Sequence, residues 1–261
     1  MDSTFTLWLA SQPLWISTVL VVGTGVMVAA LGNILVGFYY TQAELAANNI
    51  IGGFKFGFLG ELYAVMVALV LVGTWDIYQS ARTTVQSEVA ALSYLDQAAR
   101  IFDPDDAQRI HEALRRYIGA VIGLEWSTMQ VGRPSQEAER AFAEVIQAFL
   151  QVDSPRANIG AVQQSLGQTF QQVAEYRQLR VSTISRSLSY LVWYMIMFAT
   201  LAAIVFPWFF GNGNRSFQVL MAMLLAAIIM LILLVGLKLS HPFTGETGIS
   251  PDPFLLLMQR M

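Results

Sequence analysis

The chain contains no cysteine among its 261 residues, which excludes disulfide bonds, thiol catalysis and cysteine-ligated iron–sulfur clusters. Charged side chains are also scarce. They make up 13% of the sequence, and none lies between Asp2 and Glu44. Hydrophobic residues make up 55%, and the net charge of −3 gives no indication of nucleic-acid binding. This balance is far from that of a soluble domain and indicates an integral membrane protein embedded in a lipid bilayer.

Four long apolar stretches form two pairs around a charged middle segment. They cover Leu14–Tyr40, Phe54–Tyr78, Leu188–Phe210 and Phe217–Leu237. Each is long enough to cross ~30 Å of hydrocarbon as a helix, and lipid leaves a spanning backbone no alternative to helical hydrogen bonding. The first stretch lacks the basic start and cleavage site of a signal peptide, so we expect it to be a span.

The expected fold is therefore an all-α integral membrane protein with two plus two transmembrane helices and a helical insert. The domains predicted along the chain are a first transmembrane pair (1–80), the insert (81–186), a second transmembrane pair (187–239) and a tail (240–261). Eleven of the 15 Lys and Arg residues lie in 82–186. By the positive-inside rule, the insert and both termini are expected on the cytoplasmic side.

The insert shows apolar residues at helical spacing. The first stripe consists of Val85, Val89, Leu92, Leu95, Ala99 and Phe102, and the second of Ile110, Leu114, Tyr117, Val121, Leu124 and Met129. A third stripe consists of Ala138, Phe142, Val145 and Phe149, and a fourth of Ile159, Val162, Leu166, Phe170, Val173, Tyr176 and Arg180. No breaker separates the first or fourth stripe from its neighbouring span. We expect two helices that run from the membrane into the insert, over about 56–102 and from 159 to near Pro207.

The tail combines turn residues with buried-type aromatics. Two Pro-Phe pairs, Pro242-Phe243 and Pro253-Phe254, bracket Gly245. Because Pro interrupts helices and Gly permits turns, we expect an ordered, irregular segment rather than a helix. Its two Phe side chains would anchor it in grooves between helices, as a clasp on the cytoplasmic helices of its own or a neighbouring subunit.

Several short motifs occur in a characteristic order along the chain. They are Leu62-Tyr63-Ala64-Val65, Glu88 with Ala90-Ala91-Leu92, Tyr117 with Leu124-Glu125-Trp126, His241-Pro242-Phe243-Thr244-Gly245 and Ile249-Ser250-Pro251-Asp252-Pro253-Phe254. Taken together, from about Phe54 to Phe254, they resemble the bacterial bestrophin-like domain membrane proteins, a family of unknown function. One departure is that Ser240-His241 stands where the family usually has an acidic residue.

This family is distantly similar to the bestrophin ion channels. The resemblance implies a bacterial inner-membrane protein that assembles as a ring of four-span subunits, with the second span lining the pore. On this basis we expect a homo-oligomeric ion channel or pore. The alternative is a non-conducting membrane scaffold or accessory subunit, whose cytoplasmic helices bind a partner protein.

The second apolar stretch contains two carboxylates, Glu61 and Asp76. Their spacing of 15 residues is close to four turns, so they lie within about 60° of each other on one helix face, together with Val65, Ala68 and Val72. Carboxylates at membrane depth normally face water or protein. These five residues are the pore-lining candidates, with acidic rings that favour cations.

The two carboxylates also allow an interpretation without a pore. If both lie near the membrane interfaces, Glu61 bonds to a tyrosine or to backbone groups, and Asp76 pairs with Arg82 or Arg186. Carboxylates of this kind also serve as interhelical hydrogen-bonding sites.

No pattern indicates an enzyme, so no catalytic residue, cofactor or metal site is expected. His111 lies on a predicted amphipathic helix without a metal-binding spacing such as HExxH, and we expect it to be solvated or packed. His241 is expected to form a structural hydrogen bond. The arginines of the insert either meet lipid headgroups or form helix-surface salt bridges. The arginines concerned are Arg115, Arg116, Arg177 and Arg180, and their candidate partners are Glu112, Glu125 and Glu175.

Overall fold

The computed structural model describes residues 3–131, 133–152, 159–183, 189–211 and 213–261, without the side chains of 3–4, 159–164 and 190. Every regular element in these ranges is a helix, which confirms the expected all-α fold. The chain divides into two compact units. Unit 1 consists of Met1–Asp76 and Leu188–Ser240, and unit 2 of Ile77–Ser187 and His241–Met261.

Unit 1 contains the four expected spans. It begins with α1 (Ser3–Ser11), α2 (Leu14–Tyr39), α3 (Gln42–Ala47) and the first half of α4 (Asn49–Ala99). It continues with α9 (Tyr190–Val205), the 3₁₀ turn η2 (Phe206–Phe209) and α10 (Arg215–Leu239). The helices long and apolar enough to cross a membrane are Leu14–Tyr39, Asn49–Ala99, Leu191–Phe209 and Arg215–Leu239. The sequence prediction of four spans is therefore confirmed.

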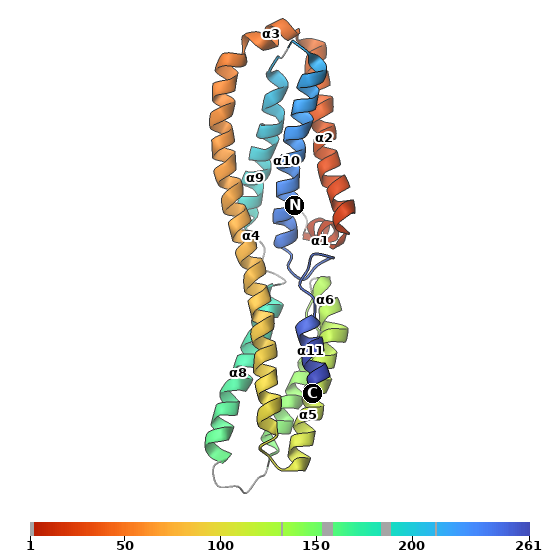
Figure 1. Cartoon of the computed structure of the whole chain (residues 1–261), viewed down its shortest axis with the longest axis vertical. Helices are drawn as coiled ribbons and strands as arrows, with labels where there is room; N and C mark the ends of the chain where they lie inside the picture. Colours follow the sequence, from red (N-terminus) through yellow and green to blue (C-terminus); the bar gives the residue numbers. More distant parts are fainter. Residues whose placement is uncertain (1–2, 132, 153–158, 184–188, 212) are drawn as a thin grey trace. The chain divides into compact units, whose positions relative to one another are not determined.

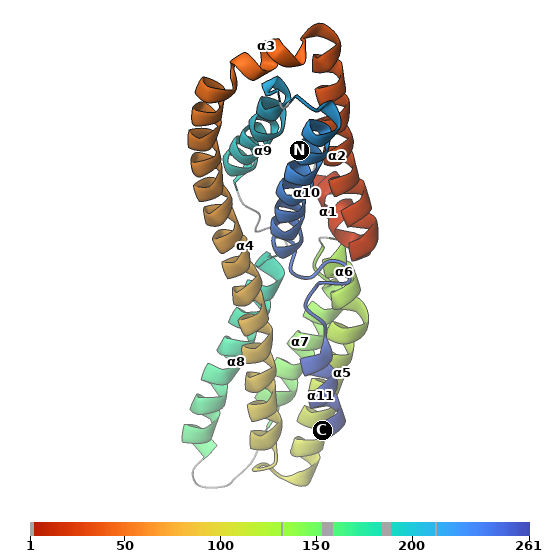
Figure 2. The ribbon, with the colours of Figure 1, turned by 45° about the horizontal axis from the view of Figure 1, so that its top comes forward.

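Within unit 1, helices α9 and α10 lie between α2 and α4 (Figures 1 and 2). Helix α10 packs closely along α2, where glycine on α2 leaves room for a side chain of α10. A Cβ atom at Gly25 would overlap Met230. Lys238 near the end of α10 is buried and donates hydrogen bonds to the carbonyls of Ala10 (2.9 Å) and Gln12 (2.6 Å), which ties the start of the chain to α10.

Every regular element in the described residues of unit 2 is a helix, and turns or irregular segments connect these helices. It contains the second half of α4, then α5 (Pro104–Ala120), the π-helical turn η1 (Val121–Glu125), α6 (Trp126–Gln130) and α7 (Gln136–Leu150). Helices α8 (Ile159–Thr183) and α11 (Asp252–Arg260) complete it. Helix α4 continues without a break from its membrane-spanning half into unit 2, over ~76 Å at 1.5 Å per residue. The first of the two expected continuous helices is therefore present.

The second expected continuous helix is interrupted. Helix α8 ends at Thr183, and α9 begins at Tyr190. Between them, Ser189 has an extended backbone (ψ 139°), and its hydroxyl accepts a hydrogen bond from the Leu191 amide. Serine side chains compete with helical backbone bonds and favour N-caps, so the prediction of one helix is wrong at Ser189. Residues 184–188 lie outside the described part of the chain.

Two further predictions need correction. The π-helical turn η1 shifts the register of the second stripe, so Leu124 is 48% exposed while Glu125 is fully buried. In the tail, Asp252–Arg260 forms helix α11 rather than irregular structure. Pro253 is tolerated there because the first turn of a helix needs no amide donor, and Asp252 suits the positive end of the helix dipole.

Candidate functional site

The five pore-lining candidates lie along one face of the membrane-spanning half of α4. Glu61, Val65, Ala68, Val72 and Asp76 are all exposed in the single chain. They cover about 22 Å along the axis and an arc of about 80°. The other face of α4 carries Tyr63, Val67 and Val70, which are buried in the core of unit 1. We call the exposed set the α4 face.

The two carboxylates of the α4 face have no hydrogen-bond or ion-pair partner among the described residues. The expected alternative partner Arg82 makes no ion pair with Asp76 there, and Arg186 lies outside the described ranges. Burying a carboxylate in hydrocarbon costs roughly 2.5–3.5 kcal/mol at the centre of a span, with smaller costs toward the ends. Glu61 and Asp76 therefore disfavour lipid contact and favour water or a protein neighbour on this face.

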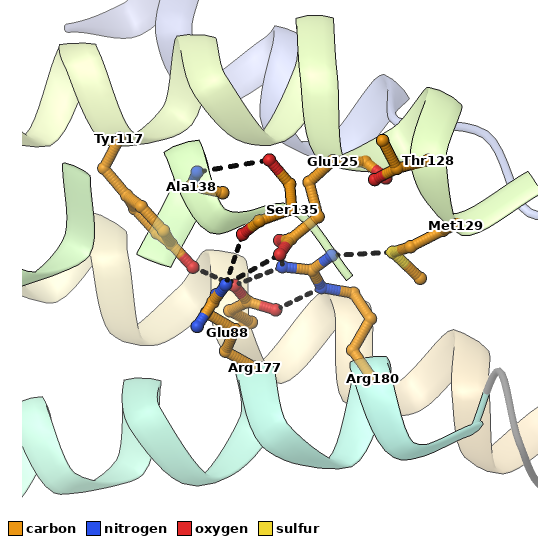
Figure 3. Close-up of polar contacts among 9 residues, drawn as sticks. All are labelled: Glu88, Tyr117, Glu125, Thr128, Met129, Ser135, Ala138, Arg177 and Arg180. Atoms are coloured by element: carbon orange, nitrogen blue, oxygen red, sulfur yellow. Dashed lines mark hydrogen bonds and ion pairs between the residues drawn. The ribbon is translucent and has the colours of Figure 1, made fainter. Parts of the chain in front are cut away.

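Unit 2 contains a second group of charged side chains, a largely buried charge cluster (Figure 3). Arg180 of α8 makes a two-pronged contact with Glu88 of α4, with Nε–Oε2 2.7 Å and Nη2–Oε1 3.1 Å. Its Nη2 also donates to Oε2 of Glu125 at 2.7 Å. The Tyr117 hydroxyl donates to Glu88 Oε1 at 2.6 Å, and Arg177 donates to Glu125 Oε1 at 2.8 Å.

The cluster is electrically balanced. Two carboxylates, Glu88 and Glu125, face two guanidinium groups, Arg177 and Arg180. Burial alone would lower the pKa of Arg180, but the Glu88 carboxylate outweighs it and raises the pKa above its ordinary range. Burial, and then the Glu88 charge, raise the pKa of Tyr117 well above its ordinary value of 10.0. Tyr117 therefore stays protonated and remains a hydrogen-bond donor at neutral pH.

The tail closes one side of this cluster. The Arg180 guanidinium lies 5.6 Å from the ring centroids of both Trp126 and Phe254. The Trp126 indole N–H donates to the carbonyl of Ile249 at 3.1 Å, and its ring meets Phe243 edge-on at 5.6 Å. Phe243 and Phe254 are both buried. The tail thus packs against helices of its own chain, with Pro242 and Pro253 bracketing the left-handed turn at Gly245 (φ +72°).

Sequence reasoning identified Glu125 as a candidate partner of the arginines but placed the pairs on the helix surface. The structure buries Arg180 and Glu125 completely and leaves Arg177 14% exposed, so contact of Arg177 and Arg180 with lipid headgroups is wrong. Glu88 was missed as an ion-pair partner. The signal was present, because Glu88 follows Val85 by three residues and lies on the first apolar stripe, as Arg180 lies on the fourth. A charge on each of two apolar stripes predicts a buried pair.

His111 lies at the end of the α4–α5 contact that is farther from the charge cluster. Its Nδ1 lies 2.8 Å from Oδ1 of Asp96, and Arg100 contacts the other oxygen of that carboxylate at 3.4 Å. Among the described residues there is no group of three side chains suited to hold a metal ion. His111 thus has a structural contact that joins α5 to α4.

Comparison with known proteins gives a family and a fold. Residues 24–254 match the bestrophin-like domain, whereas no curated protein matches the sequence. Two crystal structures of a bacterial bestrophin homolog from Klebsiella pneumoniae share the fold, each with a TM-score of 0.69 and 12% identity. The first alignment covers 92% of this chain and 96% of that one, and the second, a structure solved by zinc phasing, 91% and 95%.

A further crystal structure of a membrane protein aligns with a TM-score of 0.70 and 12% identity, over 92% of this chain and 96% of that chain. At this identity the structures establish the fold alone. The domain match, in contrast, extends from the middle of α2 to the start of α11, which is most of the chain. The protein therefore belongs to the bestrophin-like family of integral membrane proteins.

Proposed function

We propose that the protein is a subunit of a homo-oligomeric ion channel in which the α4 face lines the axis. One observation carries this proposal: Glu61 and Asp76 stand on an exposed face of a membrane span and have no partner among the described residues. A lipid-facing position would leave both carboxylates poorly solvated. Around an axis shared by several subunits, the same residues would meet water.

The α4 face has the chemistry of a cation pathway. Each carboxylate, repeated around an axis, would form an acidic ring that attracts cations and repels anions. The small side chain of Ala68 leaves room between the rings. Val65 and Val72 are 60% and 59% exposed and would form the apolar constriction. One protein with a similar fold is described as a bacterial bestrophin homolog, and this likeness supports the proposal of a channel.

The test is the reversal potential of purified protein in a planar bilayer under a salt gradient. Wild type should conduct with cation preference, and both Glu61→Gln and Asp76→Asn should reduce that preference. The control is Glu139→Gln, which removes an exposed carboxylate on α7 of unit 2 and should leave selectivity unchanged. An anion-selective current that neither substitution alters would refute the assignment of the α4 face.

The alternative function is a non-conducting scaffold or accessory subunit that binds a partner protein through the helices of unit 2. It differs from the channel in one measurable respect. Correctly assembled protein that carries no current in the bilayer would favour the scaffold and contradict the channel. The expected bacterial inner-membrane location, with unit 2 in the cytoplasm, is common to both proposals.

A further inference from the structure

Unit 1 contains a pocket of about 320 Å³ between the start of α4 and the end of η2, with Lys55 in its wall. Among the described residues that line this pocket, Lys55 alone carries a charge. The rest of the lining is neutral and largely aromatic, and consists of Asn48, Ile51, Gly52, Phe206, Phe209 and Phe210. The pocket therefore combines one positive charge with mostly apolar walls.

The positive charge of Lys55 is not neutralised by any described residue. Its ammonium group has no hydrogen-bond or ion-pair partner in the described part of the chain. Glu44 of α3 is already committed, because its Oε2 accepts hydrogen bonds from the amide and the hydroxyl of Thr41, each at 2.8 Å. Glu61 follows Lys55 by six residues and lies about 120° away around the helix. Lys55 therefore favours an anion from outside the chain.

The position of Lys55 along α4 corresponds to the level of lipid headgroups. Lys55 is the seventh residue of this helix, about 9 Å from its start, and the headgroup layer of a bilayer is roughly 5–8 Å thick on each side. The flexible stem of a lysine lets its ammonium group reach this layer. At the rim of the pocket, Ile51 and Phe209 are 68% and 47% exposed, so an apolar surface lies beside the charge. A pocket of this volume suits a headgroup rather than a whole lipid.

We propose that this pocket binds the headgroup of an anionic membrane lipid, with the lipid phosphate accepting a hydrogen bond from Lys55 and an acyl chain against Ile51 and Phe209. Lysine binds phosphate as a point charge. A zwitterionic headgroup carries an additional cation, and the described lining residues offer it no carboxylate. A water-soluble anion would leave the apolar rim unused. The inference is independent of whether the protein conducts ions.

The test is photolabelling of the full chain in phosphatidylcholine nanodiscs that contain a trace of phosphatidylglycerol with a diazirine in one acyl chain. Phosphatidylcholine with the same diazirine gives the baseline, and mass spectrometry maps the adducts. Within segments 48–55 and 206–210, phosphatidylglycerol should give about fivefold more adduct, the gain expected from one lysine at a membrane surface. Millimolar inorganic phosphate should not reduce these adducts. Equal labelling by the two lipids, or loss of the adducts with inorganic phosphate, would overturn the proposal.

Variants at exposed positions separate the pocket from the overall charge of the protein. Lys55→Gln should remove the preference for phosphatidylglycerol in these segments, and Lys55→Arg, which keeps the charge, should retain it. Ile51→Glu places a carboxylate in the lining and should also remove the preference. The matched control is Ile50→Glu, which adds the same charge at a position that is 88% exposed and outside the lining, and it should label like wild type. A preference that survives Lys55→Gln, or that Ile50→Glu removes equally, would contradict the site.

Discussion

Replacing Glu88 by Gln should destabilise unit 2 far more than replacing Glu144 by Gln, although each residue pairs with an arginine. Glu88 and Arg180 have fully buried side chains, whereas the Arg116–Glu144 pair (3.2 Å) has side chains 63% and 50% exposed. Glu88→Gln leaves two guanidinium groups facing one carboxylate, a net charge of +1 in the cluster. Removing one partner of a buried pair costs about 3–5 kcal/mol, and an exposed pair contributes ~0–1 kcal/mol.

We expect Glu88→Gln to lower the free energy of unfolding by about 3 kcal/mol, the lower end of that range. The reason is that Gln keeps the shape of Glu88 and that Arg180 keeps its contact with Glu125. Hydrogen exchange of the full chain in nanodiscs measures the effect. Amides of α5 and α8 should exchange roughly 100-fold faster in Glu88→Gln, at 1.36 kcal/mol per factor of ten, and nearly as in wild type in Glu144→Gln. The paired change Glu88→Leu with Arg180→Met leaves the balanced Glu125–Arg177 pair and should recover most of the loss. Equal effects of the two single variants would refute the reasoning.

Three further results are expected. The pKa of Tyr117 is higher in the folded state than its ordinary 10.0, so its contribution to stability is complete below pH 10 and is lost as the pH rises further. The free energy of unfolding of wild type should therefore fall above pH 10. That of Tyr117→Phe should fall with a smaller slope. Trp126→Phe removes the hydrogen bond to Ile249 and should lower the stability of the packed tail by about 1 kcal/mol. In hydrogen exchange, the amides at 249–254 should then exchange faster, with little change in α2. Cysteines placed at the exposed positions Gln136 and Ser216 should react with impermeant reagents from opposite sides of the membrane, and reaction of both from one side would contradict the expected topology.

The spans were predictable because their signal is local and strong. A run of about 20 apolar residues must form a helix in lipid, whatever it packs against. The continuous helix α4 was also predictable, since no Pro or turn sequence separates its membrane half from its apolar stripe in unit 2. The N-cap at Ser189 was not predictable, because a single serine is compatible with both a helix interior and an N-cap.

The charge cluster was harder to predict, since it depends on long-range packing. Glu88 and Arg180 are 92 residues apart, and each looks like an ordinary surface charge unless its place on an apolar stripe is given weight. The π-helical turn η1 adds the second difficulty. Helical periodicity assigns Leu124 to the core, but the wider turn rotates Glu125 inward in its place. Helix α11 was missed because Pro253 was interpreted as a breaker rather than as a first-turn residue.

The α4 face could be identified from sequence because Glu61 and Asp76 are the two carboxylates in an apolar stretch and share a face by spacing alone. Its five residues are exposed together on one face. The pocket at Lys55 could not be identified in this way. It depends on how η2 packs against the start of α4, and one lysine in the first turns of a span gives no distinctive signal.

The central claim, that the α4 face lines an ion pathway, is tested most directly by cysteine accessibility during current recording. The chain has no cysteine of its own, so each introduced thiol is the sole target. A cationic, membrane-impermeant methanethiosulfonate should reduce the current through Val65→Cys and Val72→Cys, which are exposed, and should not affect Val67→Cys, which is buried on the opposite face. Block of Val67→Cys with the other two unaffected, or no modification of any of them in conducting protein, would contradict the account.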